Sequence, residues 1–451
     1  MFFSAAARLT CRARNRCVGP FPVGASAPLL TAFSLMRWLR GRSSVMTTLE
    51  ITDYEAAAEA LRQRHLRQGL YDEGAVLMDK VLVNLHGDEH KARRTTEAKV
   101  FRKDFFNYYE REVFPATLEE TIRSYLKSGK ADLVEFGYRA MMNLTADFAG
   151  LDRPDHSAET VETMLRLLRL FGLGATLAHY KGDKEEARRD IRAGLQEFDE
   201  KFLQPSIKRR LEALEKLEKG EIGEDDLPRD VLTVLLRNRD SLDLPDDVLL
   251  REMAFFFVAG AQTSIHSLTH AMHEIFTWCE KHPEDWERMV KDRLFLQRCV
   301  HESTRLHPSS PVATRTPTCP VHLKAAGDVN EGDMVVINLY AANRDTSVFG
   351  PDAAEFNPYR ELPPNMWPYG LSFGLGMHAC LGRNLAAGVE PKEDTDPDNH
   401  HYGTVTLICH ALLRYGARPD KANPPRMDEK TERPNWGVYP IVFEKSAAAA
   451  A

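Results

Sequence analysis

The sequence predicts a mainly α protein with a small β portion. Helical periodicity recurs through the first half of the 451 residues and returns in a long apolar segment after Pro245. Strand signals are few, and no internal repeat is found. Hydrophobic residues make up 43% and charged residues 28%, which is enough apolar material for a large core and excludes the disordered, collagen-like and disulfide-scaffold classes.

Amphipathic segments carry the helical signal. The expected helices before Pro245 lie at residues 53–63, 91–109, 118–127, 158–173 and 184–217. A charged stretch, LEALEKLEKGEIGEDDLPRD, overlaps the end of the last of them and predicts a solvated connection to the next helix.

The β portion is expected after the last long helix. Residues 322–345, HLKAAGDVNEGDMVVINLYAANRD, predict a hairpin in which a turn rich in Gly, Asn and Asp precedes the β-branched run MVVINL. Residues 353–376 are rich in Pro, Gly and Asn, so we expect an irregular loop that is held in place by packing.

A basic leader precedes an acidic body. Residues 1–45 contain seven arginines and no acidic residue, whereas the whole chain has a net charge of -7. Three interpretations of the leader stay open: a misassigned start upstream of Met46, a transit peptide, and a structural arm or membrane contact. Prolines and glycines interrupt its uncharged stretch, residues 18–36, so a membrane-spanning helix is not expected. The acidic body excludes a typical nucleic-acid-binding protein.

The seven cysteines form no C-x-x-C pair, which leaves a zinc ribbon or a thioredoxin-like dithiol without support. Cys380 differs from the others because Gly374, Gly376 and Gly382 surround it. Glycines let a flat partner approach the backbone closely and leave N–H groups free to point at the sulfur. Such donors favour the thiolate, which acts as a ligand or a nucleophile, whereas most lone cysteines are inert and buried.

The spacing F-x-x-G-x-H-x-C-x-G around this cysteine closely resembles the haem-binding loop of the cytochrome P-450 superfamily. The loop residues that carry the resemblance or flank the cysteine are Phe373, Gly374, Gly376, His378, Cys380 and Gly382. The resemblance implies a cytochrome P-450 fold over residues 46–451 and haem b as the cofactor, with the Cys380 thiolate as the axial iron ligand. A thiolate donor favours cleavage of the O–O bond of bound dioxygen.

Other parts of the family pattern follow in order. Glu302 and Arg305 form E-x-x-R, and the pair lies on one helical face. The resemblance implies that Arg360 completes a buried charge cluster with them, which braces the haem loop.

Four side chains occupy the places where the family binds the haem propionates. His90 and Arg94 lie one helical turn apart, Arg315 follows the E-x-x-R helix, and His378 precedes the cysteine by two residues. Each alone is as well interpreted as a surface charge. As a set they favour anion binding, because a partly buried propionate needs charge-assisted donors.

The oxygen-activating helix of the family is matched by Ala259, Gly260, Gln262 and Thr263. The two small residues should let the helix open locally, and Thr263 matches the hydroxyl that steers protons to oxygen. Gln262 stands where the family has an acid. Because an amide cannot titrate, we expect slower oxygen activation, loss of electrons to peroxide, or a relay through another acid.

Two further features of this helix have a functional and a structural interpretation. His266, His270 and His273 share one face, which suggests a metal site, but the Glu of H-E-x-x-H is absent and packed histidines are favoured. The run Phe255–Phe257 is interpreted as core rather than substrate pocket.

An acidic insertion at residues 390–403, EPKEDTDPDNHHYG, interrupts the helix that follows the haem loop in the family. It predicts a solvated surface loop. The alternative is a gate for a redox partner on the cysteine side of the haem.

Together these features predict a soluble, cytoplasmic haem-thiolate monooxygenase that inserts one atom of dioxygen into a small apolar substrate. No dinucleotide-binding fingerprint occurs, so electrons should come from a ferredoxin or flavodoxin with an NAD(P)H-dependent reductase. Lys91, Arg93 and Arg383 are expected to meet the acidic surface of that partner. The alternatives are a peroxide-driven peroxygenase and a haem-binding or sensing protein without turnover.

Overall fold

The computed structural model describes residues 47–153, 155 and 157–444. The chain divides into two units, residues 1–45 and residues 46–451, and all described helices and strands belong to the second. The expectations for the leader, a misassigned start, a transit peptide or a structural arm, fall on residues outside the described part.

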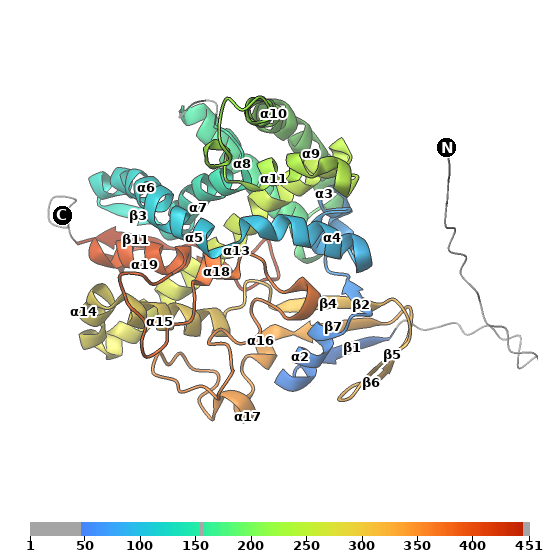
Figure 1. The fold of residues 1–451 in the computed structure, drawn as a ribbon. Helices are drawn as coiled ribbons and strands as arrows, with labels where there is room; N and C mark the ends of the chain where they lie inside the picture. Colours follow the sequence, from blue (N-terminus) through green and yellow to red (C-terminus); the bar gives the residue numbers. More distant parts are fainter. Residues whose placement is uncertain (1–46, 154, 156, 445–451) are drawn as a thin grey trace, which may run out of the picture. The chain divides into compact units, whose positions relative to one another are not determined.

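Helices make up most of the second unit, which confirms the predicted mainly α class (Figure 1). The α-helices are α2 (Tyr54–Arg62), α3 (Ala75–Met78), α4 (Gly87–Glu97), α5 (Lys103–Tyr108), α6 (Phe114–Ser128), α7 (Leu133–Ala149), α8 (Ala158–Ala175), α9 (Lys184–Phe198), α10 (Gln204–Glu218), α11 (Val231–Arg237), α12 (Arg239–Leu242), α13 (Asp246–Lys281), α14 (Pro283–Lys291), α15 (Arg293–Leu306), α16 (Leu339–Ala342), α17 (Thr346–Phe349), α18 (Arg383–Ala387) and α19 (Thr404–Arg414).

Four of the five early helices are found close to their predicted positions, as α2, α6, α8 and the run α9 to α10. The single helix expected at residues 91–109 is wrong, because a short 3₁₀ turn, Ala98–Val100, separates α4 from α5. This break carries Phe101 to the wall of the central cavity.

The strands of the described residues form four small sheets, with β1, β2 and β4 to β7 at one side of the helical body and β3 and β11 at another (Figure 1). They are β1 (Thr48–Ile51), β2 (Leu66–Gln68), β3 (Lys130–Asp132), β4 (Val312–Pro317), β5 (Val321–Leu323), β6 (Gly327–Val329), β7 (Met334–Asn338), β8 (Ala417–Pro419), β9 (Arg426–Met427), β10 (Trp436–Val438) and β11 (Pro440–Phe443). One sheet has the order β1-β7-β4-β2, with β1 parallel to β7 and the other pairs antiparallel.

A hairpin is present in the predicted region, but its second strand is β6 rather than the predicted run MVVINL. Strands β5 and β6 pair with each other around a turn, whereas MVVIN forms β7 and pairs with β1 and β4. The register joins Val335 to Arg315 and Leu49, so residues nearly 300 positions apart meet in this sheet. Such non-local pairing is not encoded in the local pattern.

The long helix α13 runs through the main hydrophobic core and packs against α7, α8, α15 and α19. Gly137 on α7 allows a close approach, since a Cβ there would lie 3.3 Å from Cγ2 of Ile265. Among the described residues α13 is the one helix long and apolar enough to cross a membrane. Most of its apolar stretch is buried inside the protein, as expected for a core helix.

The insertion at residues 390–403 is a loop whose two ends meet. Its middle is largely exposed, as predicted, but His401 and Tyr402 are buried, so its last residues belong to the core rather than to a solvated surface. The Gln297 amide donates to the carbonyls of Ala387 and Tyr402, at 2.9 and 3.1 Å, and thereby joins the end of α18 to the start of α19.

Candidate active site

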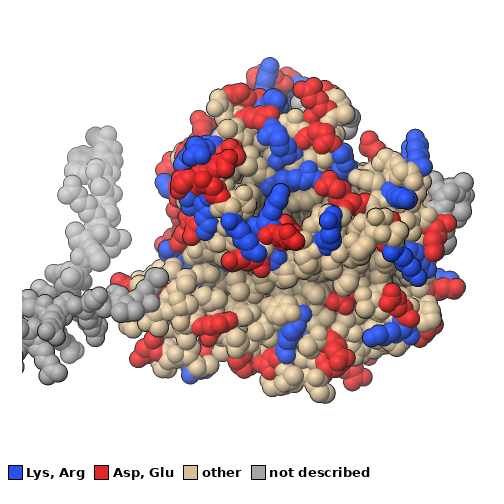
Figure 2. Space-filling model, turned by 180° about the vertical axis from the view of Figure 1, so that it is seen from behind, with Lys and Arg blue, Asp and Glu red and all other residues tan. Residues whose placement is uncertain are grey.

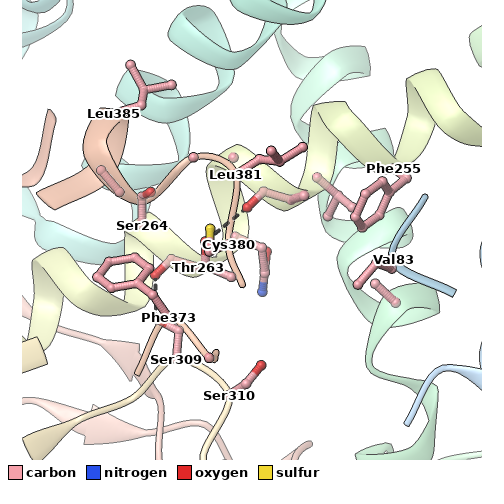
Figure 3. Close-up of a pocket in the computed structure, with 18 of the residues that line it drawn as sticks. Val83, Phe255, Thr263, Ser264, Ser309, Ser310, Phe373, Cys380, Leu381 and Leu385 are labelled. Carbon is pink, nitrogen blue, oxygen red and sulfur yellow. Dashed lines mark hydrogen bonds between the residues drawn. The ribbon is translucent and has the colours of Figure 1, made fainter. Parts of the chain in front are cut away.

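A cavity of about 350 Å³ lies between α13 and the loop that carries Cys380 (Figure 3). Val83 and Phe255 contribute to its mostly apolar wall. The predicted site residues that line it are His90, Arg94, Ala259, Gly260, Gln262, Thr263, Arg315, Phe373, Gly374, His378, Cys380 and Gly382. Residues spread over nearly 300 positions of the sequence therefore surround one space.

Gly376 lies elsewhere in the same loop. A Cβ on this glycine would lie 2.8 Å from the carbonyl oxygen of Leu61, and its φ is +69°. Glycine is needed here because the loop turns through the left-handed region directly against the end of α2.

Backbone hydrogen bonds fix the position of Cys380. Its N–H donates to the carbonyl of Phe373 at 2.8 Å, which closes the loop, and α18 begins three residues later. Burial deep in the molecule raises the pKa of the Cys380 thiol, while the N–H of Gly382 and the guanidinium of Arg94 lower it. The sulfur itself faces the cavity, because the side chain is accessible from that side.

A cluster of cationic and imidazole groups lies at one end of the cavity. The rings of His90 and His378 are 4.6 Å apart, and Arg94 donates to the carbonyl of Ala379. Arg315 is buried on β4 and donates to Gln68, with no ion pair to a described carboxylate. Burial lowers the pKa of His90 to about 4 and that of His378 to about 3.

The two histidines of this cluster are incompletely bonded. Nε2 of His90 and Nε2 of His378 are buried without a hydrogen-bond partner among the described residues. Burial also lowers the pKa of Arg315 to about 10. Buried donors of this kind are stabilised by an anion, so the residues present fit the carboxylates of a haem.

Helix α13 forms the opposite wall. The Thr263 hydroxyl donates to the Ala259 carbonyl at 2.9 Å, and Ser309 donates to the Thr263 carbonyl at 2.9 Å. The Gln262 amide is held from both sides: Oε1 accepts from the Tyr138 hydroxyl at 3.1 Å, and Nε2 lies 3.2 Å from Nε2 of His266. Its orientation is therefore fixed.

The expected local opening of this helix is not present, because α13 is a continuous α-helix from Asp246 to Lys281. Gly260 has a different use. A Cβ at this position would lie 3.1 Å from Cγ2 of Thr145, so the small residue permits close packing of α13 on α7.

The three histidines of α13 bind protein groups. His266 is 3.1 Å from the Asn435 amide, His270 is 2.9 Å from the Pro434 carbonyl, and His273 is 3.0 Å from the Tyr439 hydroxyl. No group of three or more potential metal ligands occurs within the described ranges. The favoured interpretation, packed and bonded histidines, agrees with these contacts.

The interpretation of Phe255–Phe257 as core is right for Phe256 and Phe257, which are buried in the main hydrophobic core. Phe255 is half-buried, and both Phe255 and Phe256 also line the cavity. Consecutive residues on a helix point in different directions, so the run could not lie wholly in the core.

Glu302, Arg305 and Arg360 lie together below the loop. Arg305 pairs with Glu302 through Nη2 at 2.7 Å, and Nε of Arg360 is 3.0 Å from the same carboxylate. The two arginines also donate to the carbonyls of Ala353 and Phe349. This buried network fixes residues 343–360, the segment before the cysteine loop.

One of the three expected docking residues is not at the surface. Arg93 is wrong, because it is only 3% exposed and pairs with the buried Glu252 at 2.8 Å. Lys91 is exposed, and the Arg383 guanidinium lies 4.3 Å from the centre of the Trp367 ring.

Arg433 lines the cavity and was not found from the sequence. It lies in the connection between β9 and β10, outside every motif, so no sequence signal pointed to it. Ser309 and Ser310 also line the cavity.

Curated relatives match part of the chain. A self-sufficient cytochrome P-450 monooxygenase, CYP505E3, of Aspergillus terreus is 32% identical over 185 residues, which is 35% of this chain and 17% of the relative. An indoleacetaldoxime dehydratase of Arabidopsis thaliana is 37% identical over 109 residues, 23% of this chain and 22% of the relative. The chain thus spans a small part of the length of these relatives.

Solved structures match the fold over most of the chain. The crystal structure of CalO2 is 20% identical with a TM-score of 0.68 and covers 92% of this chain and 96% of that one. CYP109E1 from Bacillus megaterium in complex with corticosterone is 17% identical with a TM-score of 0.65, covering 91% and 98%. The cytochrome P-450 family model matches residues 35–388. The chain belongs to the cytochrome P-450 family.

Proposed function

We propose that this protein is a monooxygenase that inserts one oxygen atom of dioxygen into an organic substrate held beside α13. Members of its family carry haem with a cysteine thiolate ligand. When bound, such a group supplies oxygen activation and cleavage of the O–O bond. The observation that carries the proposal is the cavity that Cys380 and Thr263 share with Arg315 and with His90 and His378, whose Nε2 atoms have no hydrogen-bond partner among the described residues.

The contacts of the residues on the cysteine side of the cavity support a role for each of them. Cys380 would be the iron ligand, and the N–H groups of Gly382 and Arg383 favour its thiolate. His90, Arg94, Arg315 and His378 would hold the propionates. Because these donors are already ordered, binding the cofactor costs little reorganisation.

On the opposite wall the Thr263 hydroxyl, which donates to the Ala259 carbonyl, would accept a hydrogen bond from a proton-carrying group at the reacting oxygen. It faces the cavity, and its bond to the Ala259 carbonyl fixes its orientation. Gln262 cannot resupply that proton, because its amide does not titrate. Gly260 and Ala259 leave this part of the wall free of bulk.

Electrons must reach the haem from a second protein or domain. We propose a ferredoxin or flavodoxin with an NAD(P)H-dependent reductase, which meets Lys91 and Arg383 near the cysteine loop. The name of the Aspergillus relative, self-sufficient, marks a different arrangement for that protein. We place the enzyme in the cytoplasm, in line with its likeness to bacterial structures such as CYP109E1.

A second candidate is peroxide-driven oxidation without a protein partner. It is favoured by one observation: Gln262 is bonded to Tyr138 and His266, so no acid occupies the place beside Thr263. A peroxide supplies its own protons and electrons, and this route would not need the missing acid.

The first test is spectroscopic. Reduction with dithionite under carbon monoxide should give the absorption band of thiolate-ligated haem, and Cys380→Ala should abolish it. Cys319→Ala is the matched control, because this partly exposed free cysteine lies away from the cavity. Survival of the band in Cys380→Ala would refute the ligand assignment.

Turnover then separates the candidates. Product formation with reductase, a ferredoxin and NAD(P)H supports the monooxygenase, and product formation with added peroxide alone supports the peroxygenase. Haem binding without product under either condition would mean a haem-binding or sensing protein.

A further inference from the structure

Arg433 is a buried arginine without a matching anion. Its side chain is 8% exposed, and Nε and Nη2 have no hydrogen-bond partner among the described residues. No carboxylate within the described ranges forms an ion pair with it. The side chain of the adjacent Glu432 is exposed and lies 3.8 Å from His179 instead.

The backbone around Arg433 is held from both sides. His270 on α13 is 2.9 Å from the Pro434 carbonyl, and His266 is 3.1 Å from the Asn435 amide. On the other side, the N–H of Glu432 donates to the His179 carbonyl at 3.3 Å. The segment that carries Arg433 is therefore held against α13 by fixed contacts of Pro434 and Asn435.

A charge in this position is costly to the folded protein. A buried ion without a partner destabilises the fold, because its lost hydration is not replaced. Burial correspondingly lowers the pKa of Arg433, with only the Tyr71 phenol opposing it. A group that completes the pair would remove this cost.

The cavity that Arg433 lines also has an apolar wall, to which Phe255, Phe256 and Val83 contribute. The cluster of His90, Arg94, Arg315 and His378 lines the same cavity. A planar guanidinium with two free donors matches a carboxylate in a bidentate pair.

We propose that the substrate is an organic acid whose carboxylate pairs with Arg433 while its apolar body lies along Phe255 and Phe256 towards Thr263. This substrate class rests on the proposed monooxygenase function. It replaces the expectation of a purely apolar substrate by an amphiphilic one. Arg433 is then a specificity-determining residue, which anchors the substrate at a distance from the reacting carbon.

The test compares acids with their neutral amides. Straight-chain acids from octanoic to hexadecanoic acid and the corresponding primary amides are titrated into the ferric haem protein, and binding is followed by the shift of the haem absorption and by calorimetry. We expect at least one acid to bind about tenfold or more tightly than its amide, the factor that about 1.4 kcal/mol gives.

Variants assign that preference to one side chain. Arg433→Met should bind acid and amide alike, with the amide affinity unchanged, and Arg433→Lys should retain part of the preference. Arg123→Met is the matched control: Arg123 is exposed on α6, and the variant should behave as the wild type.

Several outcomes would overturn the proposal. They are equal binding of acids and amides to the wild type, no binding of any acid, and an acid preference that survives in Arg433→Met. Loss of haem in Arg433→Met but not in Arg123→Met would assign Arg433 to the cofactor instead. The carbon monoxide spectrum is recorded on the same samples, so failure of the haem-thiolate assignment is distinguished from failure of the acid preference.

Discussion

Gln262 lies between two polar side chains that fix its amide. It accepts from Tyr138 and faces the unprotonated Nε2 of His266, whose pKa is lowered to about 3 by burial and by Arg433. A neutral imidazole accepts the amide N–H, which is why the amide fits this place better than a carboxylate. Neither the Gln262 amide nor the neutral His266 ring releases a proton near neutral pH, so this pair supplies no acid beside Thr263.

We predict that Gln262→Glu restores such a proton. The new carboxyl would be buried beside a neutral histidine, so its pKa should rise above the usual range and it should hold a proton near neutral pH. Peroxide released per NAD(P)H oxidised should fall several-fold, measured with equal haem content. Gln262→Met removes both amide contacts without adding an acid, and it should show no such decrease. Equal peroxide release from both variants would contradict the relay argument.

At the scale of elements, the junction between α18 and α19 depends on two glycines that touch. Gly403 has φ +81°, and a Cβ on it would lie 2.3 Å from the backbone nitrogen of Gly388. Gln297 bonds the carbonyls on both sides of this contact. The insertion therefore leaves and re-enters the helical body at one point, and α19 keeps its place on α13.

Gly403→Ala should consequently destabilise the protein strongly. Gly332→Ala is the matched control, since Gly332 also has a positive φ, +93°, but a Cβ there would meet nothing within 4 Å. The control should lose about 1 kcal/mol for the backbone conformation alone. Gly403→Ala should lose about 3 kcal/mol or more, because backbone atoms must also move. Denaturant unfolding measures both, and equal losses would show that the contact relaxes freely.

Some elements of the site could be predicted from the sequence and others could not. The loop around Cys380 and the helix that carries Thr263 are continuous segments with fixed spacing, so their residues could be named from the sequence. Arg93 was misplaced because its burial depends on Glu252, 159 positions away. Arg433 was missed because contacts from α13 and His179 place it, and neither is visible in its local sequence.

At the scale of the whole molecule, the surface carries charges of both signs, and a smaller set of charged side chains is buried. The face in Figure 2 shows Lys and Arg interspersed with Asp and Glu, without a large patch of one sign. Inside, a helical core surrounds α13 and a second core lies under the β1-β7-β4-β2 sheet. Some buried ionisable groups are incompletely paired. Because their pKa values differ between the folded and unfolded states, they make the free energy of unfolding depend on pH.

One such group is the pair of buried carboxylates Glu252 and Glu97. Glu252 is fully buried and accepts from Arg93 at 2.8 Å and from the N–H of Leu82 at 2.9 Å. Glu97 is also fully buried, and neither of its oxygens has a hydrogen-bond partner among the described residues. Burial, and then the charge of Glu252, raises the pKa of Glu97 well above its usual value. Burial raises the pKa of Glu252 to about 7.

The sign of the effect follows from proton binding. A carboxyl group whose pKa is raised in the folded state binds more protons folded than unfolded, so it lowers the free energy of unfolding as pH rises above the unfolded pKa. For Glu97 this loss begins near its ordinary value of 4.5 and continues up to the raised pKa. Glu97→Gln has the same shape and cannot ionise, so its stability relative to the wild type should increase with pH, by at most about 1.4 kcal/mol per pH unit. Unfolding measured between about pH 5 and about pH 8 tests this slope. Glu215→Gln, at an exposed site on α10, should show no slope, and a pH-independent difference for Glu97→Gln would mean that Glu97 is ionised in the folded protein.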